Sequence, residues 1–385
     1  MRVLVSSVPG WGHVNPIVPL AQAFLDCGDE VVVATGRDAC EGLEAAGLKV
    51  APCGLTQKEG MAEFHRRYPE FAGLAPTERS EFMFPRLFGE AFAPPMLADL
   101  ASIARDWDPA VIICDAAEFA GPVVAAALGV PNVTKSFGAL LPPARVAAGG
   151  ERVASLWNAH GQEPRPYGGM YEHLYLDVYP SSLQPSDWPH IRVRQPLRPT
   201  GPTSKAEYEL PGLVTESQSA PLVYVTFGTV FSNNAVLSAV VEAACKLSVR
   251  AVVTVGPDGD PASLGPQPEN VHIARYIPQD QLLPHCAAVV SHAGSGTFLA
   301  ALAAGLPQVC LPQAADQFLN AAACARSGTG ITVAPGDQTA EQVTAALGGV
   351  LSDASFRAAA EQVSDEIAAM PSPHEVAELL QSRYG

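Results

Sequence analysis

Short apolar runs alternate with longer amphipathic stretches along most of the chain. The runs are rich in valine, isoleucine and leucine and are too short to be helices, so they predict buried strands. The stretches between them repeat apolar residues at helical spacing and often end at a glycine, which predicts helices. Strands are predicted at residues 2–6, 30–34, 48–50, 111–114, 132–134, 222–226, 251–255, 271–274, 287–291 and 308–311. Strands that alternate with helices in this way form parallel sheets with helices on both faces, so the sequence predicts an α/β fold.

The alternation is interrupted between residues 196 and 221, where prolines, serines and glycines cluster without a period. This composition is typical of a linker. A chain of 385 residues is also too long for one ordinary hydrophobic core. We therefore predict a first domain over residues 1–200, a linker over 201–220 and a second domain over 221–369. Further helices are expected at about 338–350 and 353–369, and from residue 372 to 380.

Composition and charge restrict the partners that the protein can have. Apolar residues make up 48% of the chain and charged residues 16%, which is the composition of a globular protein. The net charge of −16 argues against nucleic acid or an anionic membrane as the main partner. Eight widely spaced cysteines predict reduced thiols in a cytoplasmic protein. No signal peptide is recognisable at the N-terminus, and no apolar run approaches membrane-spanning length.

A glycine-containing loop follows the predicted strand at 287–291 and leads into a predicted helix. In the loop His292-Ala-Gly-Ser-Gly-Thr297, Gly294 and Gly296 remove side chains where a ligand could approach the main chain. The free N–H groups of Ser295 to Thr297 would point at that ligand, and the helix dipole favours negative charge there. Thr297 adds a hydroxyl, and His292 adds a donor that can carry charge. The loop is thus a candidate phosphate cradle, although a glycine turn needed only for packing explains the same residues.

Three other loops of the second half should open at the same edge of its sheet, because ligands bind beyond the carboxyl ends of parallel strands. Gly228 and Thr229 could add donors to a phosphate, and Tyr276 could stack on a base. Asp316 and Gln317 could reach hydroxyl groups near the phosphate. A carboxylate beside a phosphate is repelled unless it accepts hydrogen bonds from hydroxyls, which favours a sugar as the neighbouring group. Asp316 could equally be the N-cap of the next helix, and the two roles are compatible.

In the first half, His13 and Asp115 each lie just beyond the end of a predicted strand. An aspartate that binds one imidazole nitrogen fixes the histidine tautomer and leaves the other nitrogen free to accept a proton. The pair is therefore a candidate general base, and the alternative is a histidine that serves only as a structural donor. Asp258 and Asp260 lie in a loop rich in glycine and proline, where they are typical of turns. We find no set of ligands for zinc or iron.

Residues 55–105 depart from the alternating pattern and are rich in phenylalanine and methionine. Helices that pack on the sheet explain most of these side chains. A minority could line an apolar pocket, because methionine and phenylalanine suit irregular apolar ligands.

Taken together, these motifs resemble the GT-B nucleotide-sugar glycosyltransferases, and most closely the bacterial branch that glycosylates polyketides and related natural products. The segment Val8-Pro-Gly-Trp-Gly-His-Val-Asn-Pro-Ile17 resembles the family's first loop, and Asp115 lies where the acidic partner of its histidine is found. Tyr276-Ile-Pro-Gln279 resembles the base-stacking W-x-P-Q segment. Residues 292–321 follow the donor signature, including Gly-Leu-Pro at 305–307 and Asp-Gln-x-x-Asn at 316–320. The helix after Met370-Pro-Ser-Pro373 resembles the segment, here 370–385, that crosses back to the first domain.

Two departures from the family pattern bear on the donor. The plant-type signature has a glutamate that holds the ribose hydroxyls eight residues after its histidine, and this position is Ala300 here. A missing carboxylate suits a deoxyribose, which favours a dTDP-sugar over a UDP-sugar. Tyr276 stands where a tryptophan is common, which keeps a stacking surface but leaves the base selectivity open.

The resemblance implies two Rossmann-like domains and an inverting, metal-independent transfer of a sugar or deoxysugar to an apolar aglycone such as a polyketide. His13, polarised by Asp115, would be the base, with no cofactor beyond the nucleotide-sugar as co-substrate. The donor would contact Gly228, Thr229, Tyr276, Ile277, Gln279, His292, Gly294, Ser295, Gly296, Thr297, Asp316 and Gln317. The aglycone would lie between residues 55–95 and 137–175, against Trp11, Phe64, Phe82, Phe84, Phe88 and Phe137.

Other outcomes remain open at this stage. The same fold serves nucleotide-sugar epimerases and non-catalytic partners of active transferases. His13 and Asp115 argue against a non-catalytic partner. The aromatic segment argues against an epimerase. The sequence does not separate O- from C-glycoside formation, identify the sugar or the aglycone, or decide between a monomer and a homodimer.

Overall fold

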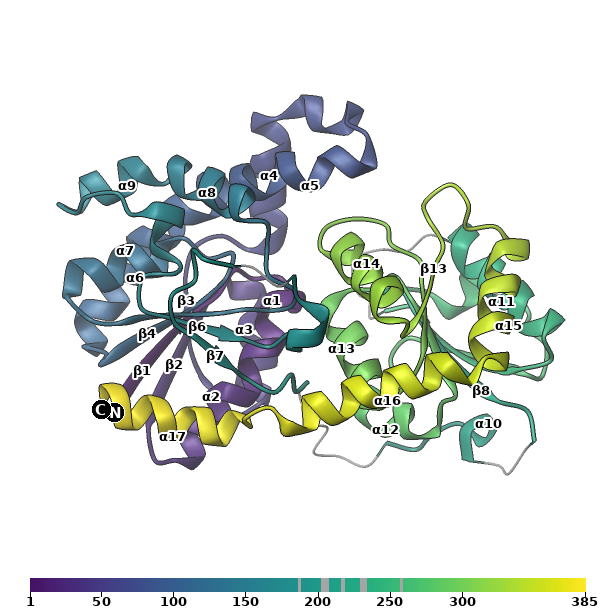
Figure 1. Cartoon of the computed structure of the whole chain (residues 1–385). Coiled ribbons are helices and arrows are strands. Elements are labelled where there is room, and N and C mark those ends of the chain that lie inside the picture. The colour runs from purple at the N-terminus through teal and green to yellow at the C-terminus, as the bar shows by residue number, and fades with distance from the viewer. Residues whose placement is uncertain (186–187, 202–207, 216–218, 229–233, 257–258) are drawn as a thin grey trace. The chain divides into compact units, whose positions relative to one another are not determined.

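The computed structural model describes residues 1–385 except 186–187, 202–207, 216–218, 229–233 and 257–258. It divides into two compact units (Figure 1). Unit 1 comprises Met1–Tyr179, Pro185–Pro202 and Met370–Gly385, and unit 2 comprises Pro180–Gln184 and Thr203–Ala369. The short segment Pro180–Gln184 thus belongs to unit 2, although it lies within the predicted first domain.

Unit 1 is built on a parallel sheet of seven strands in the order β3-β2-β1-β4-β5-β6-β7. The strands are β1 Arg2–Ser6, β2 Glu30–Thr35, β3 Lys49–Pro52, β4 Val111–Asp115, β5 Asn132–Lys135, β6 Leu174–Asp177 and β7 Arg194–Pro196. The first five were predicted from their apolar runs. Strands β6 and β7 lie in the stretch that showed no pattern, because they are short and β7, at the sheet edge, carries polar residues.

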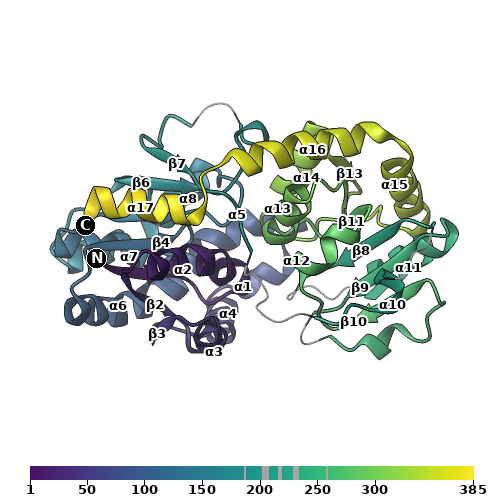
Figure 2. The ribbon, with the colours of Figure 1, turned by 90° about the horizontal axis from the view of Figure 1, so that it is seen from below.

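Helices cover both faces of this sheet (Figure 2). They are α1 Trp11–Val14, α2 Val18–Asp26, α3 Arg37–Ala45, α4 Gln57–Arg67, α5 Pro76–Arg86, α6 Ala93–Trp107, α7 Ala120–Leu128, α8 Pro143–Arg152, α9 Ala154–Ala159 and α17 Pro373–Tyr384. Residues Leu87–Phe92 form a π-helix between α5 and α6. Short 3₁₀ turns span Asn15–Ile17, Pro69–Gly73 and Pro166–Gly169.

The last helix, α17, belongs to unit 1 and packs on α2 (Figures 1 and 2). Ser372 and Glu375 form a capping box that begins the helix. The Gln381 side chain donates a hydrogen bond to the Cys27 carbonyl at 3.2 Å, and Arg198 donates to the Met370 carbonyl at 3.0 Å. These contacts join the end of the chain to its beginning within one unit.

Unit 2 has a second parallel sheet of six strands, in the order β10-β9-β8-β11-β12-β13. Its strands are β8 Leu222–Thr226, β9 Arg250–Thr254, β10 Val271–Ala274, β11 Ala288–Ser291, β12 Gln308–Cys310 and β13 Gly330–Thr332. Its helices are α10 Gly212–Thr215, α11 Asn234–Lys246, α12 Gln279–Leu282, α13 Ser295–Ala303, α14 Gln317–Ser327, α15 Ala340–Ser352 and α16 Ala354–Ala369, with 3₁₀ turns at Ser181–Leu183, Pro261–Leu264 and Leu283–His285. Two parallel α/β sheets confirm the predicted fold class.

Part of the stretch predicted as a linker is folded on unit 2. Val214 in α10 is buried against the unit 2 core, and the Arg250 guanidinium donates a hydrogen bond to the Leu213 carbonyl at 2.7 Å. The Tyr208 amide donates to the Gln281 side chain at 2.9 Å. Proline and glycine interrupted the helical period here, so the sequence pattern did not reveal these contacts.

Candidate active site

His13 and Asp115 lie together in unit 1 because their strands are neighbours. Strand β1 pairs with β4 in parallel, with Ser6 opposite Cys114, so the loops that follow both strands leave the same edge of the sheet. The first loop turns at Gly10 into the short helix α1, which carries His13. His13 Nδ1 lies 2.8 Å from Asp115 Oδ2, a close polar contact. The Asp115 side chain is 2% exposed and the His13 side chain 19% exposed, so the carboxylate is enclosed while the imidazole reaches solvent.

Two aromatic rings hold the His13 imidazole. The Phe137 ring meets it edge-on with centroids 4.5 Å apart, and the Phe88 ring lies tilted at 5.5 Å. Both rings come from elements that sequence inspection assigned to the acceptor side, and both are half-buried. Asp115 lies at Nδ1, so a base at this position would act through Nε2.

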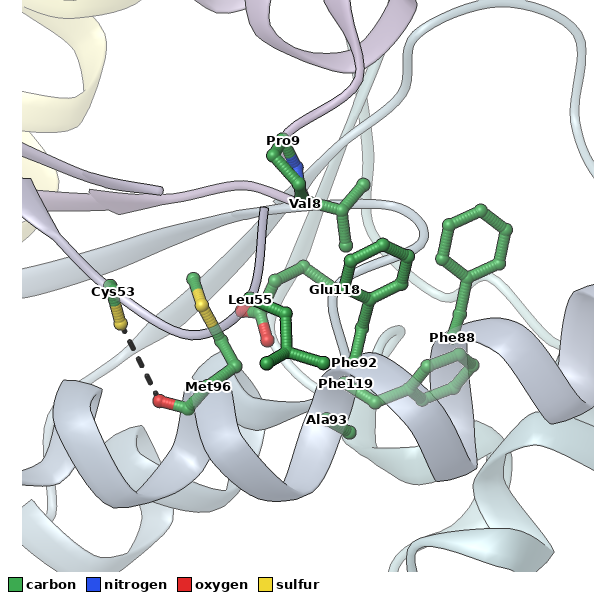
Figure 3. Close-up of a pocket in the computed structure, with 10 residues that line it drawn as sticks. All are labelled: Val8, Pro9, Cys53, Leu55, Phe88, Phe92, Ala93, Met96, Glu118 and Phe119. Carbon is green, nitrogen blue, oxygen red and sulfur yellow. Dashed lines mark hydrogen bonds between the residues drawn. The ribbon is translucent and has the colours of Figure 1, made fainter. Parts of the chain in front are cut away.

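Phe88 also lines a cavity in unit 1 (Figure 3). The enclosed part of the cavity is about 10 Å³, roughly the room of one water molecule and far below the roughly 300–1,000 Å³ of a typical ligand pocket. Its wall consists mostly of apolar side chains, with one carboxyl group among them. The lining residues are Val8, Pro9, Cys53, Leu55, Phe88, Phe92, Ala93, Met96, Glu118 and Phe119. In this unliganded structure it is too small for an aglycone or for part of one.

The other aromatic residues predicted to bind the acceptor lie elsewhere. Phe64 is fully buried in the core of unit 1, where its ring packs against Phe71 at 5.0 Å, so its side chain is not accessible to an acceptor in this structure. Phe84 is also buried, behind Phe88 and at 4.9 Å from its ring. The simple packing explanation holds for both.

Two further predicted acceptor residues are at the surface of unit 1. The Phe82 ring is half-buried and is covered by the Arg86 guanidinium at 3.8 Å. Trp11 is exposed, and its ring packs over the backbone of Gly42 in α3, where an added Cβ would come within 2.5 Å of the indole. Neither residue lines the cavity beside Phe88.

Glu118 is a buried carboxyl group that sequence reasoning missed. It is 1% exposed and lies in the turn before α7, where its oxygens accept hydrogen bonds from Ser6 Oγ at 2.6 Å, from the Ala120 amide at 2.5 Å and from the Gly121 amide at 2.8 Å. Burial raises the pKa of Glu118 to about 7, with a smaller contribution from the charge of Asp115. In the sequence, Glu118 follows two alanines, and this local pattern does not indicate that its carboxyl group is buried.

In unit 2, the glycine loop leads into α13 as predicted. The helix begins at Ser295, and its N-cap residue is Gly294, which has no side chain to cap the first turn. Such a turn keeps N–H groups available for an anion. Gly296 is exposed, and an added Cβ there would meet nothing within 4 Å among the described residues. The open main chain at Gly296 is the geometry that a phosphate cradle requires.

A buried network fixes this loop. Asn320 donates hydrogen bonds to the Ala293 carbonyl at 2.9 Å and to Ser295 Oγ at 3.0 Å. Ser295 Oγ donates to Asp316 Oδ2 at 2.6 Å. Ala293 has φ of 63°, a left-handed conformation that costs free energy in a non-glycine residue, and the Asn320 bond helps to hold it. Asp316 stands at the N-cap of α14 but makes no capping bond there, so the N-cap alternative is wrong for its side chain.

His292 is packed tightly between two of the predicted donor-site glycines. A Cβ on Gly294 would lie 2.5 Å from His292 Nε2, and one on Gly228 would lie 2.8 Å from Cε1. The packing explanation is therefore correct for Gly294, without excluding a ligand. Burial lowers the pKa of His292, against the charge of Asp316 and a hydrogen bond with the Thr226 backbone. The unliganded protein thus favours a neutral imidazole, not the charged donor considered from the sequence.

The remaining predicted donor residues differ in how accessible they are. Tyr276 is 62% exposed and presents its ring to solvent, whereas the Ile277 side chain is buried in the core. The Gln279 amide donates hydrogen bonds to Thr297 Oγ1 at 3.1 Å and to Tyr224 Oη at 3.3 Å. The buried Gln317 side chain accepts bonds from the backbone of its own loop, at 2.7 and 2.9 Å. Thr229 lies outside the described residues.

Three negative findings apply to the part of the chain that the structure describes. No group of three or more histidine, cysteine, aspartate or glutamate side chains is arranged to hold a metal ion there. None of its helices has both the length and the apolar character needed to cross a membrane. All eight cysteines, each of which is described, are free thiols.

Comparison with known proteins places this geometry in a family. Residues 22–203 match the model of the erythromycin biosynthesis protein CIII-like N-terminal domain, and residues 238–382 match that of its C-terminal domain. Elloramycin glycosyltransferase ElmGT of Streptomyces olivaceus is 33% identical over 399 aligned positions, which cover 100% of this chain and 98% of that protein. The chain belongs to the erythromycin biosynthesis protein CIII-like family of antibiotic glycosyltransferases. The predicted family and the predicted enzyme class are thereby confirmed.

Solved structures agree with this assignment of the glycosyltransferase. The spinosyn rhamnosyltransferase SpnG in complex with thymidine diphosphate superimposes with a TM-score of 0.81 at 30% identity, covering 99% of this chain and 100% of that one. The glycosyltransferase VinC in complex with dTDP has a TM-score of 0.81 at 26% identity, with 99% of both chains covered. By sequence, the chain is also similar to L-demethylnoviosyl transferase of Streptomyces niveus, with 30% identity over 98% of this chain and 97% of that protein.

Proposed function

We propose that this glycosyltransferase moves a sugar or deoxysugar from a dTDP-sugar to an apolar natural-product aglycone, with inversion at the anomeric carbon and without a metal ion. The observation that carries the proposal is the His13–Asp115 pair, a partly exposed imidazole that lies 2.8 Å from an enclosed carboxylate. The dTDP part is supported by Ala300 and by the thymidine diphosphate bound to SpnG. An O- or a C-glycoside would result, depending on which acceptor atom attacks.

The proposed reaction begins with a proton transfer to His13. Asp115 holds Nδ1 and stabilises the imidazolium, so Nε2 takes the proton from the acceptor hydroxyl as its oxygen attacks the anomeric carbon. The bond from that carbon to the diphosphate breaks on the opposite face, and the configuration inverts. The leaving diphosphate carries the negative charge that the N–H groups of α13 are arranged to receive. Fixed donors at this place would make a metal ion unnecessary.

Two substitutions test the base. In His13→Ala and Asp115→Asn we expect kcat for dTDP release in the presence of an acceptor to fall by about 10²–10⁴-fold, because general base catalysis typically supplies that factor. Binding of dTDP, measured by calorimetry, should not change, since both residues belong to unit 1 and the predicted dTDP contacts to unit 2. A near wild-type rate in His13→Ala would remove the proposed base.

The donor and the stereochemistry need a separate experiment. The protein is incubated with dTDP- and UDP-sugars of known anomeric configuration and a panel of polyphenolic aglycones, and products are detected by mass. We expect turnover with dTDP-sugars and a product whose anomeric coupling constant shows the opposite configuration. Retention of configuration would contradict the direct displacement. Conversion of the nucleotide-sugar into an epimer without an acceptor would identify an epimerase instead.

A further inference from the structure

Lys135 is a buried lysine at the carboxyl end of β5. Its side chain is 3% exposed, and its ammonium donates a hydrogen bond to the Ser136 carbonyl at 3.0 Å. An ammonium group has three N–H donors, and removing its charge from water is costly unless an opposite charge is near. A lysine kept at such a position therefore needs an electrostatic partner.

The sheet register supplies that partner. Lys135 and Asp115 are directly paired residues of the parallel strands β5 and β4, and the Ala116 amide donates to the Lys135 carbonyl at 3.0 Å. Paired residues of neighbouring strands project to the same face, with strands about 4.8 Å apart. Burial lowers the pKa of Lys135 to about 8, and the negative charge of Asp115 opposes that decrease. The ammonium is thus largely charged at neutral pH.

Asp115 therefore has basic residues on two neighbouring elements, α1 and β5. His13 Nδ1 is 2.8 Å away on α1, and Lys135 is its neighbour on β5. Phe137 follows two residues after Lys135, just beyond β5, and its ring centroid is 4.5 Å from that of the imidazole. The charge of Asp115 thus acts on two groups. One is the His13 imidazole, which must be unprotonated to act as a base, and the other is the Lys135 ammonium, which stays protonated.

We propose that Lys135 is a positioning residue whose positive charge offsets that of Asp115, so that His13 is free of its proton and available as a base at neutral pH. The inference rests on the base assigned to His13 in the proposed function. Without the ammonium, the full charge of Asp115 would act on His13 and hold a proton on it. With the ammonium, Asp115 still orients the imidazole but attracts its proton less strongly.

Other charged or titratable groups near the pair do not replace Lys135. Glu118, before α7, is a second acid and can only add negative charge. Asp177 on β6 faces Arg194 on β7 at 3.4 Å, so its charge is balanced separately. Burial raises the pKa of Tyr175 on β6 far above its ordinary value, so this phenol is neutral. Among these described groups, Lys135 brings the positive charge toward Asp115.

The test is the pH dependence of kcat/KM for dTDP release in Lys135→Met, Lys135→Gln and Lys135→Arg, between pH 5 and 9.5. Lys135→Met and Lys135→Gln remove the charge, so the midpoint of the acidic limb should shift about one unit to higher pH. At pH values below that midpoint, kcat/KM should then be about tenfold lower than in the wild type. Lys135→Arg should keep the wild-type limb. Lys49→Met is the matched control, because Lys49 is also a strand lysine of this sheet but is exposed over the Trp107 ring.

A purely structural role would lower activity equally at all pH values and leave the limb in place, and this result would overturn the proposal. Lys135→Gln retains a donor toward the Ser136 carbonyl, so it remains informative if the methionine variant does not fold. The second readout is the NMR titration of the His13 ring in labelled protein, assigned with His13→Ala. Its midpoint should rise by about one unit in Lys135→Gln, and an unchanged midpoint would refute the coupling. Because this titration needs no turnover, it tests Lys135 even if His13 is not the base.

Discussion

Replacing Gly296 by alanine adds one methyl group at the second residue of α13, where the structure has open space among the described residues. In a helix the Cα–Cβ bond tilts toward the N-terminus, so this methyl would project toward the amides of the first turn. A diphosphate bound there would lose at least one charge-assisted hydrogen bond, worth about 1.5–3 kcal/mol. The affinity for dTDP should therefore fall roughly ten- to hundredfold.

The free energy of unfolding of Gly296→Ala should rise, although its affinity for dTDP falls. Alanine is a better helix former than glycine by up to about 1 kcal/mol, and the new methyl meets no neighbour in the protein. Gly294→Ala is the matched variant, because its Cβ would lie 2.5 Å from His292 Nε2 and must displace the imidazole. We expect that variant to lose about 1–3 kcal/mol of stability through overpacking, as well as dTDP affinity.

Calorimetric titration with dTDP and thermal melts of both variants provide the measurements. Weak dTDP binding in a Gly296→Ala protein that melts at or above the wild-type temperature would assign the diphosphate to this loop. Wild-type dTDP affinity in Gly296→Ala would refute the reasoning, because a ligand that touches these amides cannot ignore a methyl group among them. Gly294 would then serve the packing of His292 alone, and Gly296 would have no role in that packing.

Three further predictions concern other parts of the two units. The pKa of Glu118 in the folded protein is about 7 against an ordinary 4.5, so stability should decline by about 3 kcal/mol as the pH rises from 4.5 to 7. Glu118→Gln cannot ionise, so its stability should change less between pH 5 and pH 8 than that of the wild type, as measured by thermal melts. The control is Glu151→Gln, at an exposed position. An equal loss of stability in Glu118→Gln and the wild type would contradict a buried, titrating carboxyl group. Asn320→Ala removes the hydrogen bonds to Ala293 and Ser295, so it should lose about 1–3 kcal/mol of stability and raise the donor KM; an unchanged KM would show that the loop holds its shape without Asn320. Treatment with EDTA should leave the rate of dTDP release unchanged, and loss of activity that Mg²⁺ restores would count against metal-free transfer.

The position of the candidate base could be predicted because it depends on topology. Residues just beyond β1 and β4 must leave the same edge of the sheet, since these strands are parallel neighbours. His13 and Asp115 therefore meet whatever the rest of unit 1 does. The glycine loop before α13 was predictable for a similar reason, because strand, loop and helix follow directly in sequence.

The roles of individual aromatic residues in one segment could not be predicted from the sequence pattern. Phe64 and Phe88 lie in the same segment rich in phenylalanine and methionine, residues 55–105, and nothing in the pattern separates them. The structure buries Phe64 in the core and places Phe88 beside His13. Their roles depend on which helix faces the sheet edge, and residues far away in the chain decide that.

Charged residues show the same limit more clearly. Periodicity of apolar residues determined the two parallel sheets, the order of most elements and the loops that carry His13, Asp115 and the glycines, because these features follow from local spacing. Glu118 and Lys135 look like surface charges in the sequence, yet both are buried within reach of Asp115. Only the tertiary structure decided this, because burial and the distance between charges depend on strands and helices that join residues far apart in the chain.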